Sequence, residues 1–185
     1  MYRSLSNRGS RIMVRRIDVV PYDPRWPNLF REEARQLEMI FGAEIVAIHH
    51  VGSTAIPNIF AKPTIDVLVE VRCIERIDEL ERDMTEQGYL PRGEFGIVGR
   101  RFFIKGTEER RTHHIHVFEA GNPETERYLA FRDYLVAHPN VAETYSRLKR
   151  ELALAFPHDI EGYMGGKDNF IKEIERKAFV WKKGR

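Results

Sequence analysis

Asp66 is the residue around which chemistry in this chain can be arranged. It lies in residues 65–71, an almost wholly apolar run whose Val and Ile content predicts a buried strand. An ionised carboxylate there is costly unless charged or hydrogen-bonding groups meet it. The preceding Gly52-Ser53-Thr54 turn offers backbone N–H groups and hydroxyls that suit a phosphate. The pattern predicts a phosphate-binding turn facing a carboxylate, the alternative being that Gly-Ser is a simple helix N-cap.

Two histidines provide a second chemical element. In the strand predicted over 113–118, alternation places His114 and His116 on one face. Imidazoles bind Mn²⁺ or Zn²⁺ but are poor ligands for Mg²⁺, so Asp66 and His116 are candidate metal ligands. Glu70, on the Asp66 face and roughly 6.5 Å along the strand from position 68, is a third candidate ligand. Alternatively, one histidine is a proton acceptor beside a catalytic Asp66, or both lie in a polar cleft without metal.

A bound phosphate also needs positive charge around it. Lys62 comes just before the acidic strand, and Arg101 and Lys105 share one face of the strand predicted over 100–105. Arg132 and Lys149 lie on predicted C-terminal helices. We expect these cations to bind the nucleotide or other phosphate, although each one taken singly also suits a surface charge or an ion pair.

Composition sets the class of protein. The 185 residues include 30 basic and 28 acidic side chains, a net charge of +2, which argues against bulk binding to nucleic acid or a membrane surface. No apolar run approaches the roughly 20 residues that span a bilayer. The single Cys73 excludes an intrachain disulfide and suits a reducing, cytoplasmic location. Residues 1–13 are expected to be a loose N-terminal leader, and residues 14–185 one domain.

The predicted elements give an α+β order. Apolar spacing predicts a helix from residue 28 that stops at Gly42, and another that spans 74–84. The alternating segments 100–105 and 113–118, joined by a short polar loop, are typical of a hairpin. Beyond residue 123 the pattern is helical to the end, with aromatic residues in the core positions. Helices at both ends of a strand-rich middle indicate one α+β domain.

Five segments of the chain resemble the GrpB family, within the nucleotidyltransferase-fold superfamily. They are VVPYDPRWPNLFREEA, HHVGSTAIPNIFAKPTIDVLVEV, THHIHVFEAG, FRDYLVAHP and LKRELA, which cover nearly the whole chain from about Val14. The resemblance implies a nucleotidyltransferase-like mixed β-sheet with flanking helices and a helical C-terminal portion. It also implies a nucleoside triphosphate and a divalent metal, Mg²⁺ or Mn²⁺ before Zn²⁺. GrpB-like domains fused to dephospho-coenzyme A kinase point to nucleotide or coenzyme metabolism.

The chain departs from the superfamily motif at one position. That motif joins Gly-Ser, here Gly52-Ser53, to an Asp-x-Asp pair whose first member matches Asp66 and whose second is Leu68. Nucleotidyl transfer with two metal ions uses two or three carboxylates to hold the ions, so Leu68 in place of the second aspartate removes an expected metal ligand. The first hypothesis is an enzyme that transfers a nucleotidyl group to an unknown acceptor. The alternatives are a non-catalytic nucleotide- or anion-binding module and a zinc-dependent hydrolase using Asp66 and the two histidines.

Overall fold

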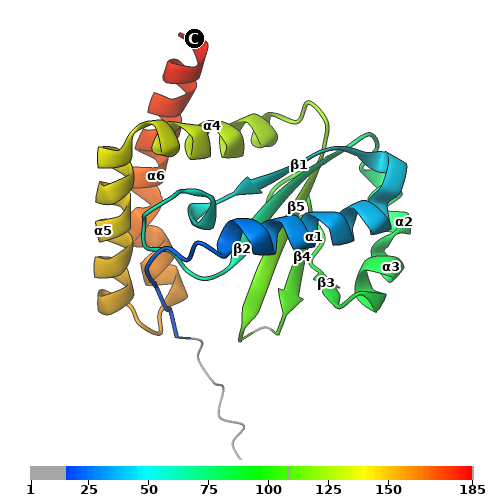
Figure 1. Cartoon of the computed structure of the whole chain (residues 1–185), viewed down its shortest axis with the longest axis horizontal. Coiled ribbons are helices and arrows are strands. Elements are labelled where there is room, and N and C mark those ends of the chain that lie inside the picture. The colour runs from blue at the N-terminus through cyan, green and yellow to red at the C-terminus, as the bar shows by residue number, and fades with distance from the viewer. Residues whose placement is uncertain (1–15, 108, 185) are drawn as a thin grey trace, which may run out of the picture.

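The computed structural model describes residues 16–107 and 109–184, so the leader expected at 1–13 lies outside the described residues. These residues form an α+β structure, which confirms the predicted fold class (Figure 1). The strands are β1 (Ile45–Val51), β2 (Ile65–Val71), β3 (Tyr89–Pro91), β4 (Arg101–Gly106) and β5 (Arg111–Glu119). The helices are α1 (Trp26–Phe41), α2 (Glu75–Glu79), α3 (Glu81–Glu86), α4 (Pro123–Ala137), α5 (Pro139–Ala155) and α6 (Ile160–Lys183), with short 3₁₀ helices η1 (Gly42–Glu44) and η2 (Ser53–Ala55).

The strands form one mixed sheet in the order β1-β2-β5-β4-β3. The central pair, β2 and β5, is parallel, and the other neighbours are antiparallel. The hairpin predicted from the two alternating segments is confirmed as the β4–β5 pair. Asp66 on β2 lies opposite His114 on β5, and Leu68 lies opposite His116. Because side chains alternate across a strand, this register brings the carboxylate and both imidazoles to one face of the sheet.

The opposite face of the sheet packs against α1, α2 and α3 (Figure 1). Leu37 and Phe41 of α1 are buried in the same core as Val67 and Val69 of β2. Each fully buried side chain of this size contributes roughly 1.5–3 kcal/mol, so this apolar layer holds β2 in place. The helix ends at Gly42 as predicted. The continuous helix expected over 74–84 is instead two short helices, because the backbone leaves helical geometry where α2 meets α3.

The Asp66 face is covered by the C-terminal helices. Figure 1 shows α5 and α6 side by side at one end of the sheet, with α4 running across α6, whose C-terminal end extends beyond α4. Leu68 and Phe118 are buried beneath Tyr128 of α4, while Tyr145 of α5 and Ile174 of α6 share a second core. No helix in the described part of the chain is both long and apolar enough to cross a membrane. The helical C-terminal portion thus closes over the part of the sheet that holds Asp66.

Candidate functional site

The turn after β1 is built around Gly52. Its φ of 69° lies in the left-handed region that glycine adopts without steric cost. A Cβ atom at this position would lie 2.2 Å from Oδ2 of Asp66, so only glycine lets the carboxylate pack directly on the turn. Ser53 then begins the short helix η2 and lines the same cavity as Asp66. The turn and the carboxylate therefore meet, as the sequence predicts.

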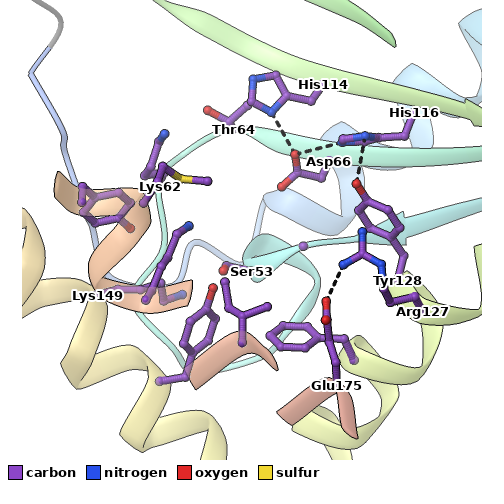
Figure 2. A pocket seen from close by; sticks show the side chains of 17 residues that line it. Ser53, Lys62, Thr64, Asp66, His114, His116, Arg127, Tyr128, Lys149 and Glu175 are labelled. Carbon is purple, nitrogen blue, oxygen red and sulfur yellow. Dashed lines mark hydrogen bonds and ion pairs between the residues drawn. The ribbon is translucent and has the colours of Figure 1, made fainter. Parts of the chain in front are cut away.

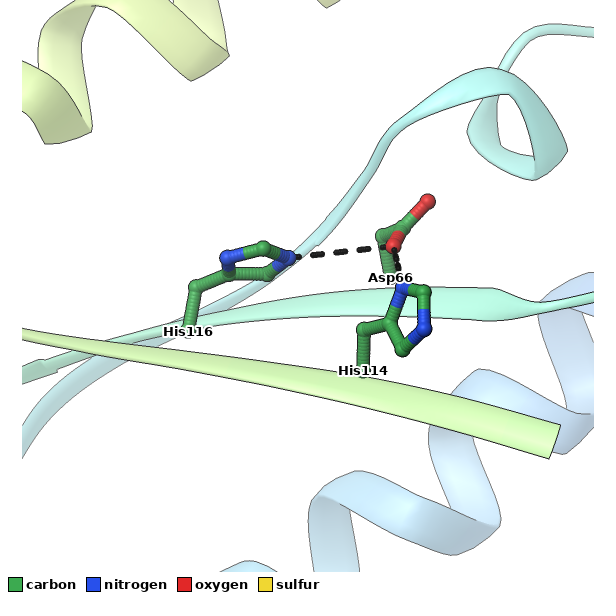
Figure 3. Close-up of side chains that lie close together, drawn as sticks. All are labelled: Asp66, His114 and His116. Atoms are coloured by element: carbon green, nitrogen blue, oxygen red, sulfur yellow. Dashed lines mark hydrogen bonds and ion pairs between the residues drawn. The ribbon is translucent and has the colours of Figure 1, made fainter. Parts of the chain in front are cut away.

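Both predicted histidines converge on Asp66 (Figure 3). The Nδ1 atom of His114 lies 3.0 Å from Oδ1 of Asp66, and the Nε2 atom of His116 lies 3.7 Å from it. Burial opposes ionisation, but the hydrogen bond from His114 and the nearby imidazole of His116 outweigh it and hold the pKa of the Asp66 carboxyl well below its usual range. Burial also lowers the pKa of His116, despite the neighbouring carboxylate. At neutral pH the site holds an ionised Asp66 beside a neutral His116 imidazole.

Arg100, which was not among the predicted site residues, determines which ring nitrogen of His116 carries the proton. Arg100 is only 4% exposed, and its Nη1 donates to Nδ1 of His116 at 3.2 Å. A guanidinium has donors only, so Nδ1 accepts and the proton of the neutral ring lies on Nε2, toward Asp66. In His114 the other ring nitrogen, Nε2, is buried and has no hydrogen-bond partner among the described residues. Nδ1 of His114 thus donates to Asp66, and the N–H of His116 is directed toward the same carboxylate from a longer distance.

The same three side chains are spaced for one metal ion. Their ligand atoms lie within 4.8 Å of one another. One carboxylate and two imidazoles suit Mn²⁺ or Zn²⁺ better than Mg²⁺. Glu70 does not add a ligand, because it pairs with His49 at 2.8 Å, so the expectation that it joins the site is wrong. Since a metal-bound imidazole donates its other N–H, ligation by His116 requires release of the Arg100 hydrogen bond. The donor set fits one ion of this kind and not the two-magnesium arrangement.

These groups open into a cavity of about 360 Å³ between the sheet and the C-terminal helices (Figure 2). The sheet and the segments that lead into it contribute the polar groups around Asp66, and the helices contribute cations and aromatic rings. From the first part come Gly52, Ser53, Lys62, Thr64, Asp66, His114 and His116; from the helices come Arg127, Tyr128, Phe131, Tyr145, Lys149, Tyr163, Met164, Lys167, Ile171 and Glu175.

Lysines form the wall of this cavity away from Asp66. Figure 2 shows Lys62 and Lys149 on that side, and Lys167 of α6 also lines the cavity. Lys149 is 1% exposed, and burial, aided by the charge of Lys167, lowers its pKa to about 7. Burial lowers the pKa of Lys167 as well. We call Lys62, Lys149 and Lys167 the lysine wall. It surrounds a space that suits an anion.

Two of the predicted cations lie elsewhere. Arg101 and Lys105 do share a face of β4, but it is the face packed against α1–α3. The guanidinium of Arg101 pairs with Asp78, with an Nη2–Oδ2 distance of 2.7 Å. The amine of Lys105 pairs with the buried Glu33 at 2.8 Å. Their prediction as phosphate ligands in the Asp66 cavity is therefore wrong, because the β4–β5 register turns them to the other side of the sheet.

Arg132 and Thr54 lie near the cavity without lining it. The Nη1 atom of Arg132 donates to the backbone carbonyl of His50 at 2.9 Å, and its Nη2 atom pairs with Asp133. The Oγ1 atom of Thr54 is 3.0 Å from Nε2 of His50, and the threonine is buried. Both residues hold β1, its turn and α4 together, which corrects the expectation that they contact the phosphate.

Sequence reasoning missed other lining residues on the C-terminal helices. Lys167 stands in a GGKD stretch that lacks the spacing of a phosphate-binding loop, so the motif gave no reason to choose it. Arg127 of α4 pairs with Glu175 of α6 across the cavity mouth (Figure 2). Tyr128, read as a core aromatic, also places its hydroxyl 3.5 Å from His116. In the sequence these residues lie next to the apolar stripes of their helices. That position indicates the flank of a helix but does not indicate a cavity.

The fold and the site define a class of protein: a mixed β-sheet with a Gly-Ser turn facing a strand aspartate, covered by a helical C-terminal portion. This arrangement is consistent with the nucleotidyltransferase-fold superfamily. The family model described as GrpB protein matches residues 16–177, and the chain belongs to that family.

Relatives agree with this assignment. The chain is 52% identical over 171 residues to UPF0157 protein YqkA of Bacillus subtilis, covering 92% of this chain and 50% of YqkA, so it spans half the length of that relative. The crystal structure of conserved protein GrpB from Enterococcus faecalis matches with a TM-score of 0.85 and 44% identity, covering 89% of this chain and 99% of that one. A chain named dephospho-CoA kinase from Mycobacterium tuberculosis is 27% identical over 188 residues, covering 88% of this chain and 46% of the kinase.

Proposed function

We propose that this chain is an enzyme that binds a phosphate-bearing small molecule, of the nucleoside triphosphate class, and transfers its nucleotidyl group to an acceptor. One observation supports this most: Asp66, His114 and His116 open into the same cavity as Ser53 and the lysine wall. Similarity to part of a chain named dephospho-CoA kinase adds support for a nucleotide-like ligand. A cytoplasmic location, expected from composition, stays a prediction.

In this proposal the two sides of the cavity have different roles. The Gly52-Ser53 turn and the lysine wall bind the phosphates, whose negative charge matches an excess of cations. Asp66 and its two histidines stand at the reacting end, where Nε2 of His114, which accepts no hydrogen bond from the described residues, can take the proton of an incoming hydroxyl while Asp66 holds the ring through Nδ1. A single Mn²⁺ or Zn²⁺ held there would neutralise charge on the phosphoryl group.

A second candidate is a nucleotide- or anion-binding module without catalysis. The observation that favours it is the missing second acid: Leu68 is buried in the core beneath α4, and Glu70 is tied to His49. The meeting of Asp66 with two imidazoles favours a third candidate, a zinc-dependent hydrolase.

Calorimetric titration of ATP with and without Mn²⁺, together with ³¹P NMR of the mixture after removal of the metal with EDTA, tests the three candidates. The enzyme proposal predicts that ATP binds more tightly with Mn²⁺, is turned over when acceptors are supplied, and loses both effects in Asp66→Asn. Metal-independent binding without turnover supports the module, and stoichiometric zinc in the purified chain supports the hydrolase. Absence of any phosphate binding contradicts the proposal.

A further inference from the structure

The amine of Lys149 is a buried group to which no described residue offers a hydrogen bond. Its side chain is 1% exposed, and within the described residues its Nζ atom has no hydrogen-bond partner. The Nζ atom lies 4.4 Å from the centroid of the Tyr145 ring. Buried ammonium groups are normally paired, because an unpaired charge in an apolar environment costs several kcal/mol. The surroundings of Lys149 therefore favour the neutral amine.

The neighbours of Lys149 act in the same direction. Lys167 lies on the same cavity wall, and its Nζ atom is 5.0 Å from the centroid of the Tyr163 ring. Both acids that line the cavity are engaged elsewhere, Asp66 by its histidines and Glu175 by Arg127. Burial and the charge of Lys167 lower the pKa of Lys149 to about 7, so near pH 7.5 much of the amine is unprotonated. An ordinary lysine is roughly 0.1% unprotonated there.

A neutral lysine amine in a desolvated pocket beside a second cation is the environment in which lysines act as nucleophiles toward carbonyl groups. We propose that Lys149 forms an imine with the carbonyl carbon of a phosphorylated aldehyde or ketone bound in the cavity. This goes beyond the proposed function but rests on its phosphate site, because Ser53 and the other lysines must hold the phosphate. The flexible lysine stem lets the amine turn from the Tyr145 ring toward the cavity.

The reaction balances without an added oxidant or reductant. The nitrogen lone pair of Lys149 attacks the carbonyl carbon, a C–N bond forms, and the C=O π electrons move to oxygen. The nitrogen loses a proton and the oxygen gains one, which gives a carbinolamine. Loss of the hydroxyl with the remaining amine proton releases one water and leaves the C=N bond. Hydrolysis reverses the step.

Trapping with a phosphorylated aldehyde tests this directly. The full chain at pH 7.5 is incubated with pyridoxal 5′-phosphate, reduced with sodium borohydride and mapped by peptide mass spectrometry. The expected result is a main adduct on Lys149 that forms at least tenfold faster than any adduct on Lys172, an exposed α6 lysine paired with Asp168. Lys149→Arg keeps a long basic side chain but removes the nucleophilic amine, so it should lose that adduct; Lys149→Met serves if the arginine variant does not fold. Equal labelling of exposed lysines with Lys149 unmodified overturns the proposal.

A phosphate-free aldehyde separates this inference from the proposed function. Propionaldehyde with borohydride needs no phosphate site, so preferential labelling of Lys149 by propionaldehyde but not by pyridoxal phosphate supports the reactive amine and contradicts the phosphate site. If ATP still binds in calorimetry while neither aldehyde prefers Lys149, the amine proposal fails and the phosphate site stands.

Discussion

Lys105 and Lys149 lie on opposite sides of the sheet, and their amines differ in the partners that surround them. The amine of Lys105 is 2.8 Å from Oε2 of Glu33, and Nε2 of His113 lies 3.7 Å from the same oxygen. The other carboxylate oxygen, Oε1, accepts from the Tyr89 hydroxyl. The amine of Lys149 is more deeply buried, yet no described residue offers it a hydrogen bond. On the α1–α3 side the Lys105 amine is thus paired with a carboxylate, whereas on the cavity side the Lys149 amine has no hydrogen-bond partner among the described residues.

The largest expected effect comes from disrupting the interactions around Glu33 on the α1–α3 side. Glu33→Gln leaves Lys105, Tyr89 and His113 around a neutral amide, and removing one partner of a buried charged network costs roughly 3–5 kcal/mol. Urea denaturation at pH 7 should show this loss in the free energy of unfolding. A loss below about 1 kcal/mol would mean that the α1–α3 side does not depend on this pairing.

Substituting methionine for each of the two lysines should change the free energy of unfolding in opposite directions. Lys149→Met replaces an unpartnered buried amine by an isosteric apolar side chain, so it should stabilise the ligand-free chain by roughly 1–4 kcal/mol. Lys105→Met leaves the Glu33 carboxylate without its lysine partner and should destabilise the chain by roughly 1–3 kcal/mol. Paired denaturation curves measure both. Equal losses at the two sites would contradict the comparison.

The pH dependence sharpens the comparison further. Because the folded pKa of Lys149 is lowered to about 7 and the unfolded value is the ordinary one near 10.5, the unfolded chain binds more protons between these values. The contribution of Lys149 to stability therefore rises with pH across this window, by at most about 1.4 kcal/mol per pH unit. The advantage of Lys149→Met should shrink from pH 7 to pH 9.5, as followed by denaturation at each pH. A constant advantage would show that Lys149 does not titrate in this range.

The smallest expected effect on stability comes from removing an ion pair at the surface. Arg101→Gln removes the pair with Asp78, whose side chain is 48% exposed, and should change the free energy of unfolding by no more than roughly 1 kcal/mol. Because Arg101 faces away from the cavity, calorimetry should show unchanged ATP binding. Weaker binding in this variant would restore Arg101 as a phosphate ligand.

The sequence predicts the Asp66 end of the cavity better than the lysine wall. Alternation along two strands places Asp66, His114 and His116 on matching faces, since the period of a strand is a local property. The same alternation groups Arg101 with Lys105 correctly. It does not reveal which face of the hairpin meets the Asp66 cavity, because that depends on the β4–β5 register and on the helices that cover each face.

The helices show where local patterns end. Apolar periodicity locates α4, α5 and α6, and it identifies Tyr145 as a core residue. It cannot tell that Lys149 and Lys167, on two different helices, lie on one cavity wall, since this follows from how the helices pack together. Glu70 illustrates the same limit: its face is predicted, but its pairing with His49 on β1 comes from the tertiary structure.

The central claim is that the lysine wall and Asp66 form one site for a phosphate-bearing ligand. Calorimetric titration of ATP into the wild-type chain, Lys149→Met and the control Lys172→Met tests it most directly. Because a bound phosphate would give the Lys149 amine the partner that keeps it protonated, we expect binding by the wild type and the control, and at least a tenfold loss of affinity in Lys149→Met even though that variant is the more stable protein. Equal affinity in all three, or no binding to the wild type, would contradict it.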